Sequence, residues 1–184
     1  MPAVHFDALP NDARVWGFAS DRPLRGDDAA TLLGEVDRFL EQWKAHGAPL
    51  RCAREWTDDH FLVVGVDPTV EQASGCSIDG LFHGLLSLER TLGTRLVAGG
   101  RIFFRDAHGE VQFAPRTELA TLAARSVLTG DTPVLDTSIS DAATWRARFE
   151  RPAKETWVSS LLNLSQASQP SNRSATKSSS LKNG

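Results

Sequence analysis

One short segment of the chain combines chemically active side chains with a position that would activate a thiol. Residues 73–80 read Ala-Ser-Gly-Cys-Ser-Ile-Asp-Gly and lead directly into an amphipathic pattern. The pattern predicts a helix over 77–92, which places Cys76 at the helix N-terminus. Unpaired backbone N–H groups and the positive end of the helix dipole favour a thiolate there. Cys76 is therefore the candidate nucleophile.

Two further candidates share the helix face of Cys76. At about 100° per residue, Asp79 and His83 lie on the same side as Cys76, opposite a leucine stripe, and their four-residue spacing lets them pair. Cys76 and His83 lie roughly 10 Å apart along the axis, too far for the hydrogen bond of a Cys–His pair. The catalytic candidates are Cys76, Asp79 and His83, and the missing base would have to come from elsewhere, from His60 or His108.

A structural interpretation of the same segment stays open. A free cysteine often behaves as a small apolar side chain, so Cys76 can simply pack in the helix-entry turn, with Ser74 or Ser77 as the cap. Gly80 and Gly84 each cost about 1 kcal/mol of helix propensity, which indicates that a neighbouring backbone, a second subunit or a ligand approaches this face. The residues expected to form a binding surface are Ser74, Gly75, Ser77 and Gly80.

The remaining motifs give no further candidate site, and one comparison argues against a nucleotide-binding function. A Walker-type phosphate loop needs Gly-x-x-x-x-Gly-Lys-Ser/Thr, and the nearest glycine-rich stretch, 93–101, leads into a strand instead of a helix. Asp58, Asp59 and His60 are explained by a solvated turn. We therefore expect no ATP hydrolysis by this chain, no cofactor and no metal site.

Composition bounds the class of protein. The chain has 184 residues, of which 41% are hydrophobic and 23% charged, as in ordinary soluble proteins, and a net charge of −3 that attracts neither nucleic acid nor anionic membranes. Two cysteines are too few for a disulfide framework, the N-terminus lacks a signal-peptide pattern, and no apolar run approaches the roughly 18–20 residues of a membrane span. We expect a cytoplasmic protein without nucleic-acid or membrane partners.

Hydrophobic periodicity predicts the elements that must position these residues. In chain order they are a strand at 15–20, a helix from Asp27 or Asp28 to a stop at His46-Gly47, a hairpin of 50–56 and 61–66, the helix at 77–92, and a second hairpin of 101–105 and 110–114. The run at 61–66 is nearly all apolar, which is typical of a central strand covered on both faces, or of a strand covered on one face and by a neighbouring sheet edge. Further along, the pattern predicts a helix at 117–129, an extended piece at 134–136, a short helix capped by Ser140, and a last amphipathic turn or two carrying Trp157 and Leu161.

The order strand, helix, strand, strand, helix, strand is that of ferredoxin-like folds. We therefore predict an α+β fold, a ferredoxin-like βαββαβ antiparallel sheet with helices on one face, plus a C-terminal helical extension. The expected organisation is an irregular lead-in at 1–14, a single α+β domain at 15–164, and a disordered Ser-rich tail at 165–184.

The segments 15–17, 39–47, 73–79 and 152–157, above all the Ser-Gly-Cys-Ser-Ile-Asp string at 74–79, resemble a family of small bacterial proteins. Members of that family often carry the name ABC transporter ATPase. The resemblance covers about residues 15–160 and implies no catalytic assignment. The name conflicts with the absence of a phosphate loop from this chain.

Three functions follow from these features. The first is a non-enzymatic binding or interaction module that uses an exposed sheet face or the small-residue face of the 77–92 helix. It predicts a shallow groove or a two-fold homodimer contact there, with an unknown protein or small-molecule partner. The second is a thiol-dependent enzyme or redox sensor with Cys76 as nucleophile. The third is an accessory subunit of a nucleotide-driven complex.

Overall fold

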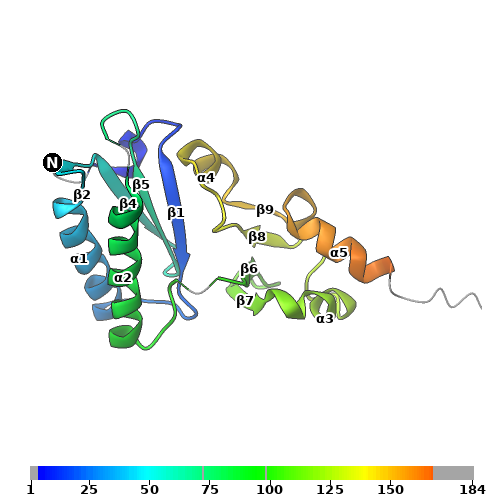
Figure 1. Cartoon of the computed structure of the whole chain (residues 1–184). Coiled ribbons are helices and arrows are strands. Elements are labelled where there is room, and N and C mark those ends of the chain that lie inside the picture. Colours follow the sequence, from blue (N-terminus) through cyan, green and yellow to red (C-terminus); the bar gives the residue numbers. More distant parts are fainter. Residues whose placement is uncertain (1–3, 72, 98, 168–184) are drawn as a thin grey trace, which may run out of the picture.

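The structure is a computed structural model that describes residues 4–71, 73–97 and 99–167, with side chains described up to residue 162. It shows a mixed α+β fold of small antiparallel sheets and several helices (Figure 1). The strands are β1 (Arg14–Ala19), β2 (Lys44–Ala45), β3 (Ala48–Pro49), β4 (Cys52–Thr57), β5 (Phe61–Val66), β6 (Arg101–Arg105), β7 (Val111–Pro115), β8 (Pro133–Leu135) and β9 (Glu150–Pro152). The helices are α1 (Asp27–Gln42), α2 (Gly75–Leu92), α3 (Leu119–Ala124), α4 (Ala142–Arg148) and α5 (Val158–Ala167).

The first sheet has the order β1-β5-β4, with β5 antiparallel to both neighbours. All six residues of β5 are buried, and alternate side chains enter different clusters. Leu62 and Val64 pack with α1 and α2, whereas Val63 packs with Phe6 and the helix α4. The prediction that 61–66 is a central strand covered on both faces is confirmed. The sheet face that we expected to be exposed is instead covered by the N-terminal segment and α4.

Helix α1 forms where the apolar stripe predicts it, but its ends differ from the prediction. Gly26, with φ 55°, precedes the first turn, and neither Asp27 nor Asp28 is the N-cap. The two acids lie in the first turn instead, where the helix dipole favours them. The predicted stop at His46-Gly47 is wrong, because α1 ends at Gln42 and these two residues form the turn between β2 and β3. Their φ values of 51° and 84° suit a type I′ hairpin turn.

Helix α2 begins two residues before the predicted start and ends where predicted. The Ser74 hydroxyl accepts a hydrogen bond from the Ser77 backbone N–H at 3.3 Å, which caps the first turn. Gly93 ends the helix in the left-handed conformation, with φ 62°. The Trp43 ring N–H donates to the Ser77 carbonyl at 2.9 Å and so ties the start of α2 to the end of α1.

The predicted single sheet does not form. Strands β1, β5 and β4 have the neighbour order of a ferredoxin-like sheet, but β6 belongs to a second sheet with the order β7-β6-β8-β9. The edge of β1 that β6 would need is already occupied, because Val15 donates to the Ser140 carbonyl at 3.0 Å and Ala19 to the Leu96 carbonyl at 3.2 Å. The second sheet instead buries Ile102, among others, against α3 and α5.

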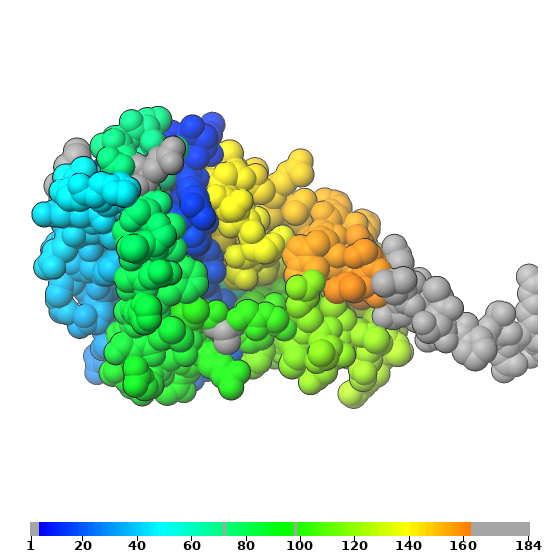
Figure 2. Space-filling model, viewed as in Figure 1, coloured from blue at the N-terminus to red at the C-terminus, as the bar shows by residue number. Residues whose placement is uncertain are grey.

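Aromatic rings join the two sheets. Phe61 of β5 is fully buried, and its ring centroid lies 5.3 Å from that of Phe103 in β6. It also lies 5.1 Å from the ring of Phe149, which follows α4. Figure 2 shows the consequence on the surface, where α1 and α2 form one side of the molecule and the second sheet with its helices forms the other.

The C-terminal helices differ from their predicted bounds. Helix α3 ends at Ala124 instead of 129, and Ser126 adopts a φ of 55° that a helix cannot continue through. The carboxylate of Asp141, and not the predicted Ser140, caps α4 by accepting from the Thr144 N–H at 2.8 Å. Helix α5 extends to Ala167 into the predicted tail, and the rest of that tail, 168–184, lies outside the described residues. The predicted irregular lead-in contains a 3₁₀ turn, Phe6–Ala8, with Phe6 buried.

None of the helices in the described part of the chain combines the length and the apolar character needed to cross a membrane.

Candidate functional site

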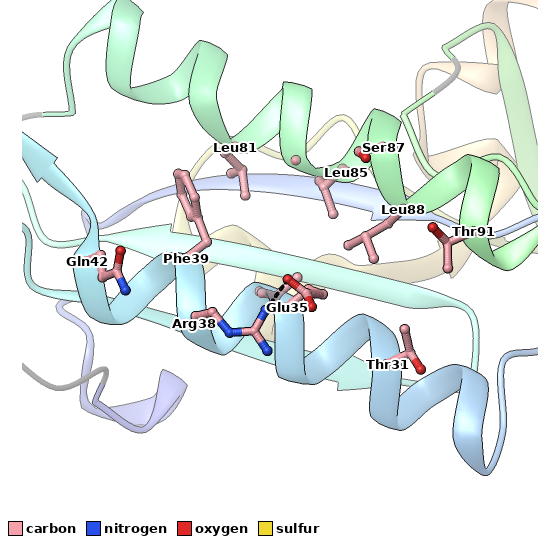
Figure 3. A pocket seen from close by; sticks show the side chains of 12 residues that line it. Thr31, Glu35, Arg38, Phe39, Gln42, Leu81, Leu85, Ser87, Leu88 and Thr91 are labelled. Carbon is pink, nitrogen blue, oxygen red and sulfur yellow. Dashed lines mark ion pairs between the residues drawn. The ribbon is translucent and has the colours of Figure 1, made fainter.

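A groove runs between α1 and α2 on the side of these helices that faces away from the sheet (Figure 3). It has a volume of about 520 Å³. The two helices contribute equally to its lining, which consists of Thr31, Glu35, Val36, Arg38, Phe39, Gln42, Leu81, Gly84, Leu85, Ser87, Leu88 and Thr91. The binding hypothesis predicted a shallow groove on the small-residue face of the 77–92 helix. This groove contains Gly84 of α2, but none of the predicted binding residues Ser74, Gly75, Ser77 and Gly80 lines it.

The floor of the groove is apolar. Val36, Leu81 and Leu85 are buried, each at 2% exposure or less, and Leu88 continues the same row. Phe39 is half-buried and stands in the groove beside Leu81, as Figure 3 shows. These side chains come from the stripes that also pack α1 and α2 on the sheet, so the floor is fixed by the core of the protein.

The rim of the groove is polar. Glu35 and Arg38 form an ion pair within α1 and stand at its edge. Ser87 and Thr91 stand on the opposite wall, and both are exposed. The groove therefore offers an apolar strip bordered by hydroxyls and by one paired acid and base, a surface suited to an amphipathic ligand.

The two helical glycines act differently. A Cβ at Gly80 would lie 3.5 Å from the Phe39 ring, which is an ordinary van der Waals contact, so Gly80 lies against α1 and an alanine would also fit there. A Cβ at Gly84 would meet no atom of the described structure within 4 Å. Gly84 therefore leaves open space in the groove wall, and packing within the chain does not explain it.

The catalytic candidates do not form a site together. Cys76, Asp79 and His83 are all exposed on α2, and none of them lines the groove. The His83 Nδ1 lies 2.8 Å from the backbone carbonyl of Asp79, so the side-chain pair that the spacing allows does not form. Among the described residues, no group of three potential metal ligands occurs.

The two histidines considered as a distant base lie in other elements. His60 is buried at 7% exposure between the strands, with its Nδ1 3.0 Å from the Ser20 carbonyl. His108 lies in the turn between β6 and β7, which belongs to the second sheet. Neither histidine belongs to the element that carries Cys76.

The predicted binding residues of the helix start serve the helix itself. Ser74 caps α2, and the Ser77 hydroxyl donates to the Ser74 carbonyl at 2.9 Å. Gly75 is the exposed first residue of α2, and Gly80 lies beside the Phe39 ring. The sequence analysis did not predict the α1 wall of the groove. Glu35, Arg38 and Gln42 have the residue types of an ordinary solvated helix face, and only the packing of α2 beside α1 makes them part of a groove.

The glycine-rich stretch before β6 lines a second, smaller pocket of about 260 Å³ where the two sheets meet. Its charged groups are engaged within the chain. Arg101 pairs with Asp21 and donates to the Ala19 carbonyl at 3.1 Å, and burial lowers the pKa of its guanidinium. Asp136 accepts hydrogen bonds from the backbone N–H and the hydroxyl of Ser138. The contacts of Arg101 around this pocket therefore connect the second sheet to the end of β1 in the first sheet.

The two cysteines are expected to differ sharply toward iodoacetamide. Cys76 is exposed and should be carboxamidomethylated in the folded protein. Cys52 is fully buried, and burial raises the pKa of its thiol to about 11, so it should react only after unfolding in urea. Peptide mass mapping before and after unfolding measures both sites. Labelling of Cys52 in the native protein would contradict its place in the core.

A comparison with family models, with curated proteins and with solved structures finds no match to this chain.

Proposed function

We propose that this protein is a non-enzymatic binding module and that its ligand site is the groove between α1 and α2. The observation that carries the proposal is the open space above Gly84 in a groove with an apolar floor. Glycine costs about 1 kcal/mol in a helix interior relative to alanine. The open space above Gly84 lies beside the apolar floor of the groove, so a ligand seated there can bury apolar surface against Leu81, Leu85 and Leu88.

The shape of the groove favours a helical peptide as the ligand. The α1 wall extends from Thr31 to Gln42, which is about three helical turns. An amphipathic helix of that length presents apolar side chains at every third or fourth position, and these match the spacing of Leu81, Leu85 and Leu88 on the floor. The rim pair of Glu35 and Arg38 is neutral overall, so we expect little dependence on the ligand's net charge.

Peptides selected from a displayed library of amphipathic twelve-residue helices test this proposal. Gly84→Leu places a side chain in the groove, and it should weaken binding of the selected peptides by about tenfold or more. The helix itself tolerates the change, because leucine is a better helix former than glycine. Thermal stability should therefore stay the same or rise.

Gly34→Leu is the matched control. Gly34 is an exposed glycine inside α1, and a Cβ there would also meet no described atom within 4 Å, but it does not line the groove. This variant gains the same helix propensity and should bind the peptides like the wild-type protein. Selected peptides that bind Gly84→Leu and wild type equally would overturn the proposal, as would a library that yields no binder.

A further inference from the structure

Strand β7 (Val111–Pro115) is an outer strand of the second sheet (Figure 1). Its inner side pairs with β6, where Gln112 lies opposite Phe104 and Phe113 opposite Phe103. At the end of this ladder, the Asp106 N–H donates to the Glu110 carbonyl at 3.0 Å, so Asp106 and Glu110 form a hydrogen-bonded pair. This pair determines which of the following pairs are hydrogen-bonded. Because the pairs alternate in an antiparallel ladder, Gln112 bonds to β6, while the N–H and C=O groups of Val111 and Phe113 point outward.

This outer edge is open. Among the described residues, no backbone–backbone hydrogen bond outside the sheet ladders involves Val111 or Phe113. The Phe113 side chain is 42% exposed, which makes it one of the exposed large hydrophobic residues of the chain. The first sheet is less open, since Val15 and Ala19 of β1 donate to loop carbonyls. An open strand edge with an exposed aromatic ring is a template for a further strand.

We propose that two copies of this chain pair through β7, antiparallel and about a two-fold axis at Phe113, and so join their second sheets. In this register the two Phe113 residues exchange their outward hydrogen bonds. Val111 lies opposite Pro115 of the other copy, and because proline has no N–H, the carbonyl of Pro115 only accepts. The exposed Phe113 rings then lie across from one another, where cross-strand aromatic pairs stabilise a ladder.

Charge selects a second copy as the occupant and fixes this register. Residues opposite one another have numbers that add up to twice 113, so Glu110 of each copy faces Arg116 of the other. Glu110 lies directly before β7 and Arg116 directly after it, so antiparallel pairing brings the acid end of one strand beside the basic end of the other, twice per dimer. Both residues are exposed, and within one copy the Arg116 guanidinium lies 4.3 Å over the Trp157 ring, which leaves its edge for a carboxylate. A shift by two residues, which keeps the outward N–H and C=O groups paired, would place Glu110 opposite the uncharged Ala114.

Analytical ultracentrifugation of the full chain over a range of concentrations, with a charge exchange at the two positions, tests the proposal. The wild-type protein should dimerise. Glu110→Arg and Arg116→Glu each place like charges opposite one another twice per dimer, and each should weaken the dimer by about tenfold. The combined variant, Glu110→Arg with Arg116→Glu, restores opposite charges and should recover most of the wild-type affinity.

Circular dichroism of each variant checks the fold, which should not change because both side chains are exposed. A wild-type protein that stays monomeric would overturn the proposal. So would a dimer that neither single change weakens, or a combined variant as weak as the single ones. The proposal goes beyond the binding function, since no β7 residue lines the α1–α2 groove. Peptide binding that Gly84→Leu weakens in a monomeric protein would therefore refute the dimer alone.

Discussion

Replacing Phe61 with alanine is expected to destabilise the protein by about 3–5 kcal/mol, the usual range for a fully buried phenylalanine. Phe61 is 0% exposed and lies in the central strand of the first sheet. Its ring makes edge contacts with Phe103 at 5.3 Å and with Phe149 at 5.1 Å. The substitution therefore leaves a cavity where the two sheets meet, and both sheets lose packing.

Urea denaturation followed by tryptophan fluorescence measures this loss. Leu86→Ala is the control, because Leu86 is 42% exposed on α2, and we expect a change within about 0.5 kcal/mol there. A Phe61→Ala protein that loses less than about 1 kcal/mol would show that the sheets do not depend on this ring for their contact.

Replacing Trp145 with alanine is expected to cost a similar amount, about 3–5 kcal/mol, for a different reason. Trp145 of α4 is 3% exposed and stacks on Phe149 with ring centroids 4.3 Å apart. It covers the face of the first sheet opposite α1 and α2, together with Phe6 and Leu9. Its removal opens that face to water.

A second variant, Trp145→Phe, shows how much of the lost stability comes from removing the aromatic ring and how much comes from the smaller side-chain volume. It keeps an aromatic ring against Phe149 and should cost clearly less than Trp145→Ala in the same urea experiment. The ring also explains Gly17, since a Cβ there would lie 2.9 Å from Trp145 Cζ3 and 2.8 Å from the Thr137 carbonyl oxygen. Equal losses for the two Trp145 variants would contradict a packing role for the ring.

Local patterns predicted the elements well where one face of a segment is buried. The run from Phe61 to Val66 indicated a central strand, and the leucine stripe with Gly93 gave the end of α2, because burial and helix ends leave direct marks on residue type. The predicted caps of α1 and α4 were wrong. At α4 two neighbouring polar residues, Ser140 and Asp141, could each serve, whereas α1 follows Gly26, which has no side chain to act as a cap.

The sheet arrangement could not be predicted, because it depends on contacts between distant segments. Nothing in the strand pattern shows that Leu96 and Ser140 occupy the edge of β1, yet these bonds keep β6 out of the first sheet. The groove was partly predicted. Gly84 drew attention to the correct helix, but the α1 wall needed the packing of two helices that are far apart in the sequence.

Methyl NMR of the leucine residues, with a library-selected helical peptide added in steps, tests the central claim that the α1–α2 groove is the ligand site. We expect the methyl signals of Leu81, Leu85 and Leu88 to shift in proportion to the bound fraction, while those of Leu128 and Leu135 in the second half of the chain keep their positions. Shifts at Leu128 and Leu135 with none at Leu81, Leu85 and Leu88 would contradict it.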